Sequence, residues 1–234
     1  MQPSIDLTDR DIRQREIVPP AKLAACHAVV IGVGAIGRQV AVQLAAIGVA
    51  SMELIDHDTV GVENLATQAY WPADIDRAKV IATAELCHHI NPQAKVTVRE
   101  ERFRRSIARE LRDVRVVEGL NHTLAVFCCV DSITTRGLIW ESVRESADLF
   151  VDGRMSAEVM RVLASDQPAQ DDYYSTTLFA ADRAYAGSCT AKSTVYTASI
   201  AAGLMISQFT RWLRGLPVDR DITLNLLSAE LITA

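Results

Sequence analysis

The sequence lacks the features that mark several large classes of protein. No apolar run is long enough to span a membrane, and the first residues have neither the basic nor the apolar part of a secretion signal. Aromatic residues make up only 6% of the chain, and 24 Lys and Arg face 29 Asp and Glu, without a basic block. Proteins that bind nucleic acids usually carry such a block. We therefore expect a cytoplasmic protein whose partners are neither nucleic acids nor membranes.

Cysteines are few and irregularly spaced. The chain has five, none of them in a CxxC pair, at Cys26, Cys87, Cys128, Cys129 and Cys189. Structural zinc sites and disulfide frameworks need regular cysteine spacings. The sequence therefore predicts reduced thiols and no structural zinc, and the apolar surroundings of Cys128 and Cys129 place both in the core.

The length of 234 residues suits one α/β domain, and no repeat or shift in composition marks a second. We expect residues 1–234 to form a single domain with a polar N-terminal arm over residues 1–26. Residues 167–189 have no clear periodicity, which predicts a flexible crossover loop that can order over a partner.

The stretch 28–48, AVVIGVGAIGRQVAVQLAAIG, predicts a strand, a tight turn and a helix. An apolar run leads into Gly32, Gly34 and Gly37, and apolar residues then recur at helical spacing. Glycines allow the backbone to approach a phosphate closely, and the first turn of the following helix offers free N–H groups. This turn is therefore a predicted anion-binding site.

Asp56 ends a second predicted strand, residues 51–55, at the distance where a ribose-binding carboxylate follows a glycine-rich turn. Two classes of nucleotide-binding protein share these features. An NAD(P)-dependent oxidoreductase would have the same turn and acid, so this pattern alone leaves ATP and NAD(P) open.

Further elements follow from the apolar pattern. Predicted helices cover residues 74–89, with Asp74 as N-cap, and residues 106–116, 133–147 and 190–213. Predicted strands cover residues 95–99, 124–130, 149–155, 158–166 and 222–228. Strand 158–166 follows its neighbour too closely for a helical crossover, so it must pair antiparallel. We expect a Rossmann-like mixed sheet, parallel in its N-terminal part and antiparallel towards the C-terminus, with helices on both faces.

Two charged residues are predicted to lie beside the glycine turn. Asp131 directly follows the buried strand 124–130, and Lys79 lies in the first turns of the helix after the 56–79 segment. Open α/β sheets bind ligands at the carboxyl ends of their strands. Alone, however, Lys79 reads as an ordinary solvated helix residue.

Several motifs together resemble the ThiF/MoeB/HesA branch of the ubiquitin-activating-enzyme (E1-like) superfamily. They are RDIRQ at 10–14, GVGAIG at 32–37, DHDTVGVENLATQ at 56–68, Lys79, and CVDSITTR at 129–136. The resemblance implies that the chain adenylates the C-terminal glycine carboxylate of a ubiquitin-like protein or peptide with MgATP. It also implies a homodimer.

The resemblance also implies roles for individual residues. Gly32, Gly34, Ala35 and Gly37 would surround the triphosphate, Asp56 would bind the ribose, and Asn64, Gln68 and Lys79 would bind phosphates. Asp131, next to Ser132, would help to hold magnesium, with Asp58 as a second carboxylate; Arg13 would reach into the partner subunit's site. Read in isolation, Asp58 and Asn64 are equally typical of turn and cap residues.

Three departures from the family pattern make the chain a divergent member. Thr67 stands where the family's NLxRQ motif has an arginine that meets the γ-phosphate, and Ser132 replaces the Asn of the usual DN pair. The zinc-binding CxxC pairs common in this branch are missing as well. A catalytically weak binding or scaffold subunit therefore stays open as an alternative.

Cys189, in the sequence GSCT, is a candidate acceptor of the activated carboxylate as a thioester. It precedes a predicted helix, whose N-terminus lowers the pKa of a thiol and raises its thiolate fraction. The alternative is a small packed residue beside Ser188 or Thr190.

Overall fold

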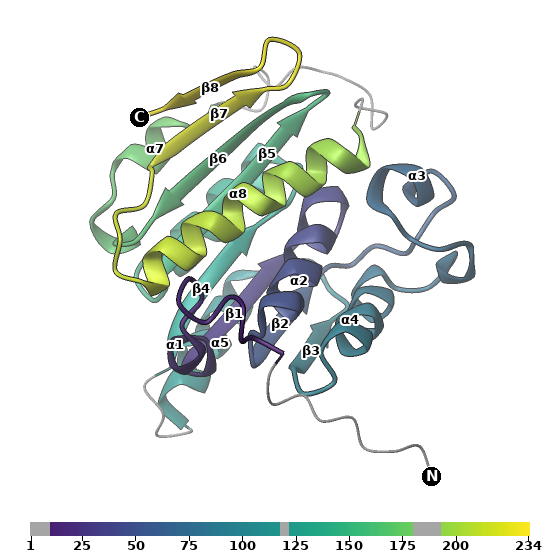
Figure 1. The fold of residues 1–234 in the computed structure, drawn as a ribbon, viewed down its shortest axis with the longest axis horizontal. Coiled ribbons are helices and arrows are strands. Elements are labelled where there is room, and N and C mark those ends of the chain that lie inside the picture. The colour runs from purple at the N-terminus through teal and green to yellow at the C-terminus, as the bar shows by residue number, and fades with distance from the viewer. Residues whose placement is uncertain (1–9, 118–121, 180–192) are drawn as a thin grey trace.

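An eight-stranded mixed sheet runs through the protein, with helices on both faces (Figure 1). This computed structural model describes residues 10–117, 122–179 and 193–234, without the side chains of residues 113–117. The strand order is β3-β2-β1-β4-β5-β6-β7-β8.

The first five strands are parallel: β1 (Cys26–Ile31), β2 (Ser51–Ile55), β3 (Lys95–Arg99), β4 (Thr123–Cys128) and β5 (Leu149–Ser156). The chain first builds outward from β1 to β2 and β3, then returns to place β4 on the other side of β1. Strand order therefore reverses between β1 and β4. Ligands of open α/β sheets bind outside the carboxyl ends of the strands at such a point.

The remaining strands are antiparallel: β6 (Val159–Ser165), β7 (Asp221–Asn225) and the edge strand β8 (Glu230–Thr233). This confirms the predicted mixed sheet and the antiparallel pairing of β5 with β6. The sequence pattern did not predict β8, because all four of its residues are exposed and no buried face imposes an alternation of apolar residues.

Figure 1 shows α2 (Ala35–Ile47), α4 (Lys79–Ile90) and α8 (Val195–Leu213) on one face of the sheet. Helix α8 packs closely on β5, β6 and α2, with Ala198, Ala201 and Ala202 fully buried. Small side chains let a helix approach its neighbours closely. This layer therefore holds α2, and with it the glycine turn, firmly against the sheet.

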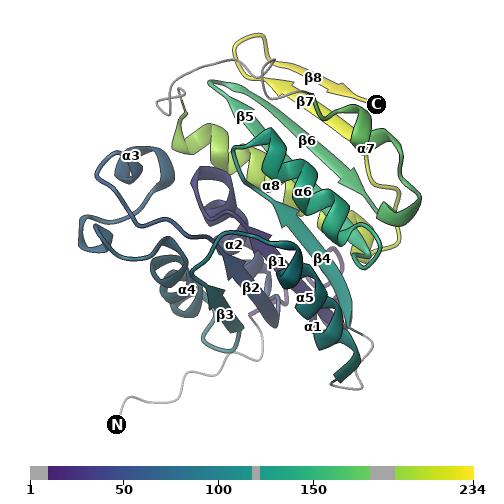
Figure 2. The same cartoon turned by 180° about the vertical axis from the view of Figure 1, so that it is seen from behind.

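Figure 2 shows the opposite face, covered by α5 (Arg105–Val117), α6 (Ile133–Val143) and the short α7 (Tyr173–Thr176). Three aromatic rings lock this layer: Trp140 of α6 lies 5.0 Å from Phe150 of β5 and 4.5 Å from Tyr174 of α7, between ring centroids. Such contacts add to the free energy gained by burying apolar surface.

Short elements complete the chain: α1 (Pro20–Ala24), α3 (Asn64–Gln68) and the 3-10 turns Pro72–Asp74 and Pro168–Gln170. The arm before α1 is fastened to the C-terminal end of α2. Arg10 Nη2 donates to the carbonyl oxygens of Ala45 and Ala46, and Gln14 Nε2 donates to that of Ile47. Among the described residues, no helix combines the length and apolar character needed to cross a membrane.

The predicted helix start at Asp74 is wrong. Asp74 ends a 3-10 turn, where its carboxylate accepts hydrogen bonds from the Trp71 N–H and from Arg77. Asp76 then has a φ of 64°, and Ala78 is held extended by a β-bridge to Thr59. Because this tertiary contact interrupts the helical pattern, α4 begins only at Lys79.

Other boundaries differ by a few residues. Helix α6 ends at Val143 rather than at residue 147, because the Val143 carbonyl accepts from the N–H groups of both Ser146 and Ala147 in a closing turn. Helix α8 begins at Val195, capped by the Thr194 hydroxyl, instead of at residue 190. Strand β7 ends at Asn225 instead of at residue 228, because the Asn225 side chain accepts from the N–H groups of Leu227 and Ser228 in the turn to β8.

Candidate nucleotide-binding site

The glycine turn between β1 and α2 is shaped by close backbone contacts. Gly32 has a φ of +85°, and a Cβ there would lie 3.0 Å from the Cys129 backbone. Gly34 is the N-cap of α2 and has no side chain to satisfy the first helical N–H groups. The N–H groups of the first turn, beginning at Ala35, are therefore free to bind an anion.

Gly37 has a different role from the other two glycines. A Cβ at Gly37 would lie 1.8 Å from the carbonyl oxygen of Gly32, so only glycine lets α2 sit this close to the turn. Gly37 is not among the residues that line the cavity described below. The structure thus gives it a packing role in shaping the turn.

Asp56 braces the turn from the end of β2. Its Oδ2 accepts from the Val33 N–H at 2.7 Å, and its Oδ1 accepts from the Asp58 N–H at 2.9 Å. Its side chain is 9% exposed and lines the cavity. Each carboxylate oxygen has two lone pairs, so both oxygens keep an acceptor site for a ligand hydroxyl.

Lys79 is the first residue of α4, and its ammonium group lies in the same cavity. Its Nζ is 3.1 Å from Asp58 Oδ2, and its N–H donates to the Asp58 carbonyl at 2.9 Å. The Lys79 side chain is 8% exposed, whereas that of Asp58 is half exposed. This double contact with Asp58 holds Lys79 in place at the cavity.

The short helix α3 contributes Gln68, whose buried Oε1 has no hydrogen-bond partner and lines the cavity. Asn64, at the start of α3, is buried and accepts from the Gly61 N–H at 2.9 Å, away from the cavity lining. The Thr67 hydroxyl donates to the Glu63 carbonyl within its own turn. Of the two residues predicted from α3, the structure therefore brings only Gln68 to the site.

Asp131 and Ser132 follow β4 and line the cavity from the other side of the turn. Both side chains are exposed, and the Ser132 hydroxyl accepts from the Thr135 N–H as the N-cap of α6. The replacement of a family asparagine by serine thus keeps the cap. The Asp131 carboxylate is accessible to a ligand or a cation.

These residues share one cavity of about 490 Å³ at the carboxyl edge of the sheet, where strand order reverses between β1 and β4. The lining combines charged and polar side chains with apolar ones, of which Ile55, Phe103, Val130 and Leu138 belong to or pack against the core layer beneath α5 and α6. A lining that is partly polar and partly apolar suits a nucleotide, which carries both phosphates and an aromatic base.

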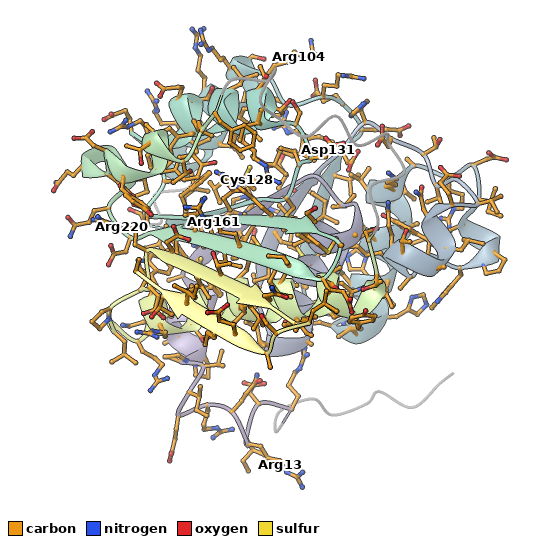
Figure 3. All side chains as sticks on the ribbon, turned by 90° about the horizontal axis from the view of Figure 1, so that it is seen from above. Arg13, Arg104, Cys128, Asp131, Arg161 and Arg220 are labelled. Atoms are coloured by element: carbon orange, nitrogen blue, oxygen red, sulfur yellow. The ribbon has the colours of Figure 1, made fainter. Side chains whose placement is uncertain are left out.

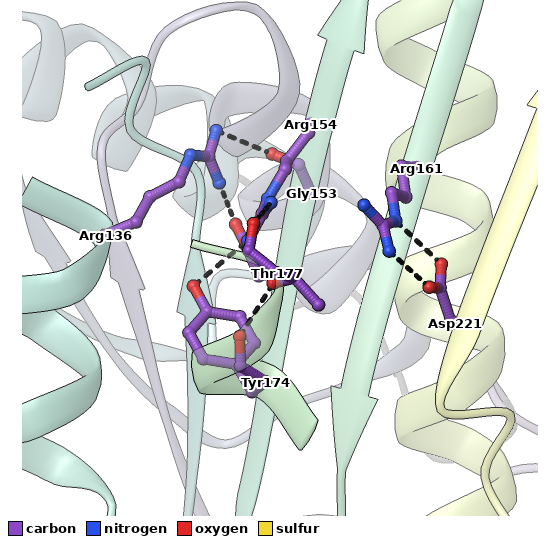
Figure 4. A network of polar contacts seen from close by, with 8 residues as sticks. Arg136, Gly153, Arg154, Arg161, Tyr174, Thr177 and Asp221 are labelled. Atoms are coloured by element: carbon purple, nitrogen blue, oxygen red, sulfur yellow. Dashed lines mark hydrogen bonds and ion pairs between the residues drawn. The ribbon is translucent and has the colours of Figure 1, made fainter. Parts of the chain in front are cut away.

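A network of buried charged side chains borders the cavity (Figure 4). Sequence reasoning did not predict this network. Arg136 of α6 lines the cavity, pairs with the fully buried Asp152 of β5 and donates to the Gly153 carbonyl at 3.1 Å. Arg154 Nε and the Tyr174 hydroxyl also donate to Asp152, at 2.7 and 3.1 Å. Burial lowers the pKa of Arg136, because desolvation disfavours its charged form.

The cysteines fall into different environments. Cys128 is fully buried at the end of β4, as predicted, whereas Cys129 follows the strand, packs half-buried against the core and also lines the cavity. Burial raises the pKa of both thiols, which keeps them protonated at neutral pH. Cys189 lies outside the described residues.

Arg13 is exposed on the N-terminal arm and points into solvent (Figure 3). The same view shows Asp131 on the far side of the molecule. Arg13 is therefore the one predicted catalytic residue of the described chain that the fold does not bring to the cavity.

A possible cation site follows from the oxygen donors of this edge. Among the described residues, one group of three has ligand atoms within 4.8 Å of one another: Asp56, His57 and Asp58. Magnesium prefers oxygen ligands and retains several waters, so one or two carboxylates suffice to hold it beside phosphates. The exposed Asp131 and half-exposed Asp58 fit that requirement.

Parts of the chain are similar in sequence to known adenylyltransferases. The chain is 28% identical over 116 residues to the molybdopterin-synthase adenylyltransferase of Haemophilus influenzae. The aligned region covers 49% of this chain and 44% of that protein. It is also 28% identical over 116 residues to the sulfur carrier protein ThiS adenylyltransferase of Escherichia coli, covering 49% of this chain and 43% of the relative. The chain thus spans less than half the length of these curated relatives.

Solved structures share the fold. The crystal structure of Escherichia coli MccB with AMPCPP and MccA superposes with a TM-score of 0.74 at 14% identity, over 97% of this chain and 71% of that one. The sequence model of the ThiF family matches residues 9–233. With the glycine turn, Asp56, Lys79 and Asp131 at one edge, this match shows that the chain belongs to the ThiF family.

Proposed function

We propose that the chain binds ATP and adenylates the C-terminal carboxylate of a ubiquitin-like protein or peptide. One observation carries the proposal: a single cavity brings the free N–H groups of α2 together with Asp56, Lys79 and Asp131. The related adenylyltransferases named above and the AMPCPP bound to a protein of the same fold support it.

The lining of the cavity suggests how ATP would be placed. The triphosphate would lie against the N–H groups of α2 beside Lys79, and the ribose hydroxyls would donate to the Asp56 carboxylate. The adenine base would pack against the apolar side chains of Phe103 and Leu138. In this placement Asp131 would face the α-phosphate.

Adenylation joins two anions, so the site must offset their repulsion. An oxygen of the acceptor carboxylate attacks the α-phosphorus, the bond to the bridging oxygen breaks, and pyrophosphate leaves with its electron pair. Positive charge and N–H donors that are in place beforehand stabilise the charge that builds on the phosphoryl oxygens. Lys79 and the first turn of α2 supply these groups, and magnesium held by Asp131 and Asp58 would neutralise the leaving pyrophosphate.

The proposal is tested by ATP–pyrophosphate exchange, because adenylation is reversible until the acyl group is transferred. Any small protein ending in Gly-Gly that is encoded beside this chain would be the first candidate acceptor to test. Exchange should require the free C-terminal carboxylate of the acceptor and should be lost when the last two residues are removed. Binding of both MgATP and acceptor without exchange would instead favour the scaffold alternative.

We further propose that the protein acts as a cytoplasmic homodimer in which Arg13 completes the partner's site. Arg13 is exposed and lies far from its own cavity, as a residue that acts in the partner must (Figure 3). Mixing Arg13→Ala subunits with Lys79→Ala subunits should then restore one competent site per heterodimer. Verified heterodimers without any recovery of exchange would exclude action in the partner.

A thioester step at Cys189 is the finer part of the proposal. If the thiol accepts the acyl group, Cys189→Ser should keep pyrophosphate exchange but lose any thiol-sensitive adduct with the acceptor. A serine hydroxyl cannot replace the thiolate at neutral pH, because its pKa is far higher. Full turnover by Cys189→Ser would mean that the final nucleophile attacks the adenylate directly.

A further inference from the structure

The side chains that line the cavity carry more negative than positive charge. Within the described chain, Lys79, Arg102 and Arg136 face the four carboxylates of Asp56, Asp58, Glu101 and Asp131. Two of the cations are already paired, Lys79 with Asp58 and Arg136 with Asp152. The side chains of the lining therefore add little net positive potential for a triphosphate to that of the α2 N–H groups, and a cation behind the lining would add to it.

Arg38, in the second turn of α2, is a buried cation behind the glycine turn. It is only 1% exposed and donates to neutral groups, the Thr83 hydroxyl at 3.3 Å and the Ala69 carbonyl at 3.2 Å. Its guanidinium lies 3.9 Å above the centre of the Tyr70 ring, and its Nε has no partner. None of the described carboxylates forms an ion pair with it, so its charge is not cancelled locally.

The position of Arg38 couples it to the phosphate-binding turn. Its N–H donates to the Gly34 carbonyl at 3.0 Å, and the Tyr70 hydroxyl donates to the Val33 carbonyl at 2.7 Å. Burial raises the pKa of Tyr70 to about 12, so this hydroxyl remains a neutral donor. Only one aromatic ring and one helical turn therefore separate the guanidinium from the turn.

Arg38 does not line the cavity, so it cannot touch a ligand there. It can act through its electric field, which is screened only weakly because the surrounding residues are buried. An unpaired buried guanidinium also costs stability. A polyanion bound at the turn would offset part of that cost.

We propose that Arg38 is an electrostatic positioning residue that supplies, from behind the glycine turn, part of the positive potential holding the triphosphate. This proposal rests on ATP binding as proposed above. It also accounts for an uncharged residue at Thr67, which lies two positions before the Ala69 carbonyl that Arg38 contacts. An arginine introduced at position 67 would add charge at the same end of α3.

Calorimetry on the full chain tests the proposal with ATP in EDTA, a tetraanion, and with AMP, a dianion. In Arg38→Gln the dissociation constant should rise roughly tenfold for ATP and about threefold for AMP, since a field effect scales with ligand charge. Arg38→Lys, which keeps the charge, should stay close to wild type. Thr67→Arg added to Arg38→Gln should recover most of the lost ATP affinity.

A purely structural role predicts different results. The proposal would be overturned if Arg38→Gln weakened the binding of ATP and AMP by the same factor, or weakened the binding of neither. It would also be overturned if Thr67→Arg restored no ATP affinity. Arg38→Met is the second variant if Arg38→Gln does not fold, because its unbranched apolar side chain needs no hydrogen bonds. If the wild-type chain itself binds no ATP, the proposed function fails; if it binds ATP and the losses are equal, only the role of Arg38 fails.

Discussion

The two halves of the sheet position their functional groups by different means. In the parallel half, β1, β2 and β4 end at one edge, and backbone geometry at the glycine turn creates the anion-binding site. In the other half, the last parallel strand β5 and the antiparallel strands β6 and β7 carry ion pairs on the face towards α6 and α7 (Figure 4). Arg136 links the two, since it lines the cavity and pairs with Asp152 of β5.

The comparison shows which features tolerate substitution. A site built from backbone N–H groups depends on the absence of side chains, so adding one atom damages it. A site built from buried ion pairs depends on keeping both partners, because the remaining charge is left without compensation. The predictions below separate these two kinds of dependence.

Gly37→Ala should have the largest effect on stability. Its Cβ would lie 1.8 Å from the Gly32 carbonyl oxygen, and neither α2 nor β1 can move away within a close-packed core. We expect the free energy of unfolding to fall by about 5 kcal/mol, or folding to be lost. Urea denaturation of both proteins measures this difference in the free energy of unfolding.

The matched control is Gly203→Ala in α8. The nearest atom to an added Cβ there is Gln43 Oε1 at 3.8 Å, and alanine is a better helix former than glycine. This change should be neutral or should stabilise by about 0.5 kcal/mol. Similar losses in the two variants would contradict the close-contact account of Gly37.

Asp152→Asn tests the buried network of the other half. It leaves Arg136 and Arg154, which are both largely buried, without the fully buried carboxylate that they share. We expect a loss of about 3 to 5 kcal/mol, measured by the same unfolding experiment. An unchanged stability would mean that the carbonyls of Gly153 and Thr177 suffice to compensate both guanidinium groups.

Asp131→Ala should reduce activity and spare the fold. Its carboxylate is exposed beyond the end of β4, so we expect stability within about 0.5 kcal/mol of wild type. Pyrophosphate exchange should fall by about 100-fold or more, because the proposed magnesium site would lose a ligand. Asp166→Ala, an exposed carboxylate beyond β6 at the opposite edge of the sheet, is the control and should leave exchange intact.

Asp221→Asn should have the smallest effect, and one that depends on pH. Hydrogen bonds from Arg161 hold the pKa of Asp221 below its usual value, with Tyr173 as a further donor. The folded state thus has the lower pKa, so the stabilisation is complete above the unfolded pKa of about 4 and is lost as pH falls through the folded pKa. We expect the free energy of unfolding of the wild type to exceed that of the variant by about 1 kcal/mol at pH 7, and this difference to shrink as pH falls through the folded pKa. A constant difference across this range would contradict the assignment.

The sequence predicted the parallel half well because its signals are local. A glycine turn between a strand and a helix, followed by Asp56 at the end of the next strand, can be recognised from spacing alone. The position of Asp131 followed in the same way from the buried run before it. Its motifs also indicated the family that the comparisons show.

Features that depend on tertiary contacts could not be predicted in this way. The start of α4 at Lys79 depends on the bridge between Thr59 and Ala78, which competes with helix propensity. Arg38 has the sequence context of an ordinary helix arginine, and only the packing of Tyr70 shows that it is buried. Arg136 can pair with Asp152 only because α6 packs beside β5. No local sequence pattern predicts that packing.

The measurement that tests the central claim most directly is calorimetric titration of the wild-type chain with MgATP and, separately, with NADH. The cavity is proposed to be an ATP site, in which Lys79 meets a triphosphate. We therefore predict that MgATP binds, that NADH does not, and that Lys79→Ala weakens MgATP binding by about tenfold or more. Tighter binding of NADH than of MgATP would contradict the proposal of an adenylation site.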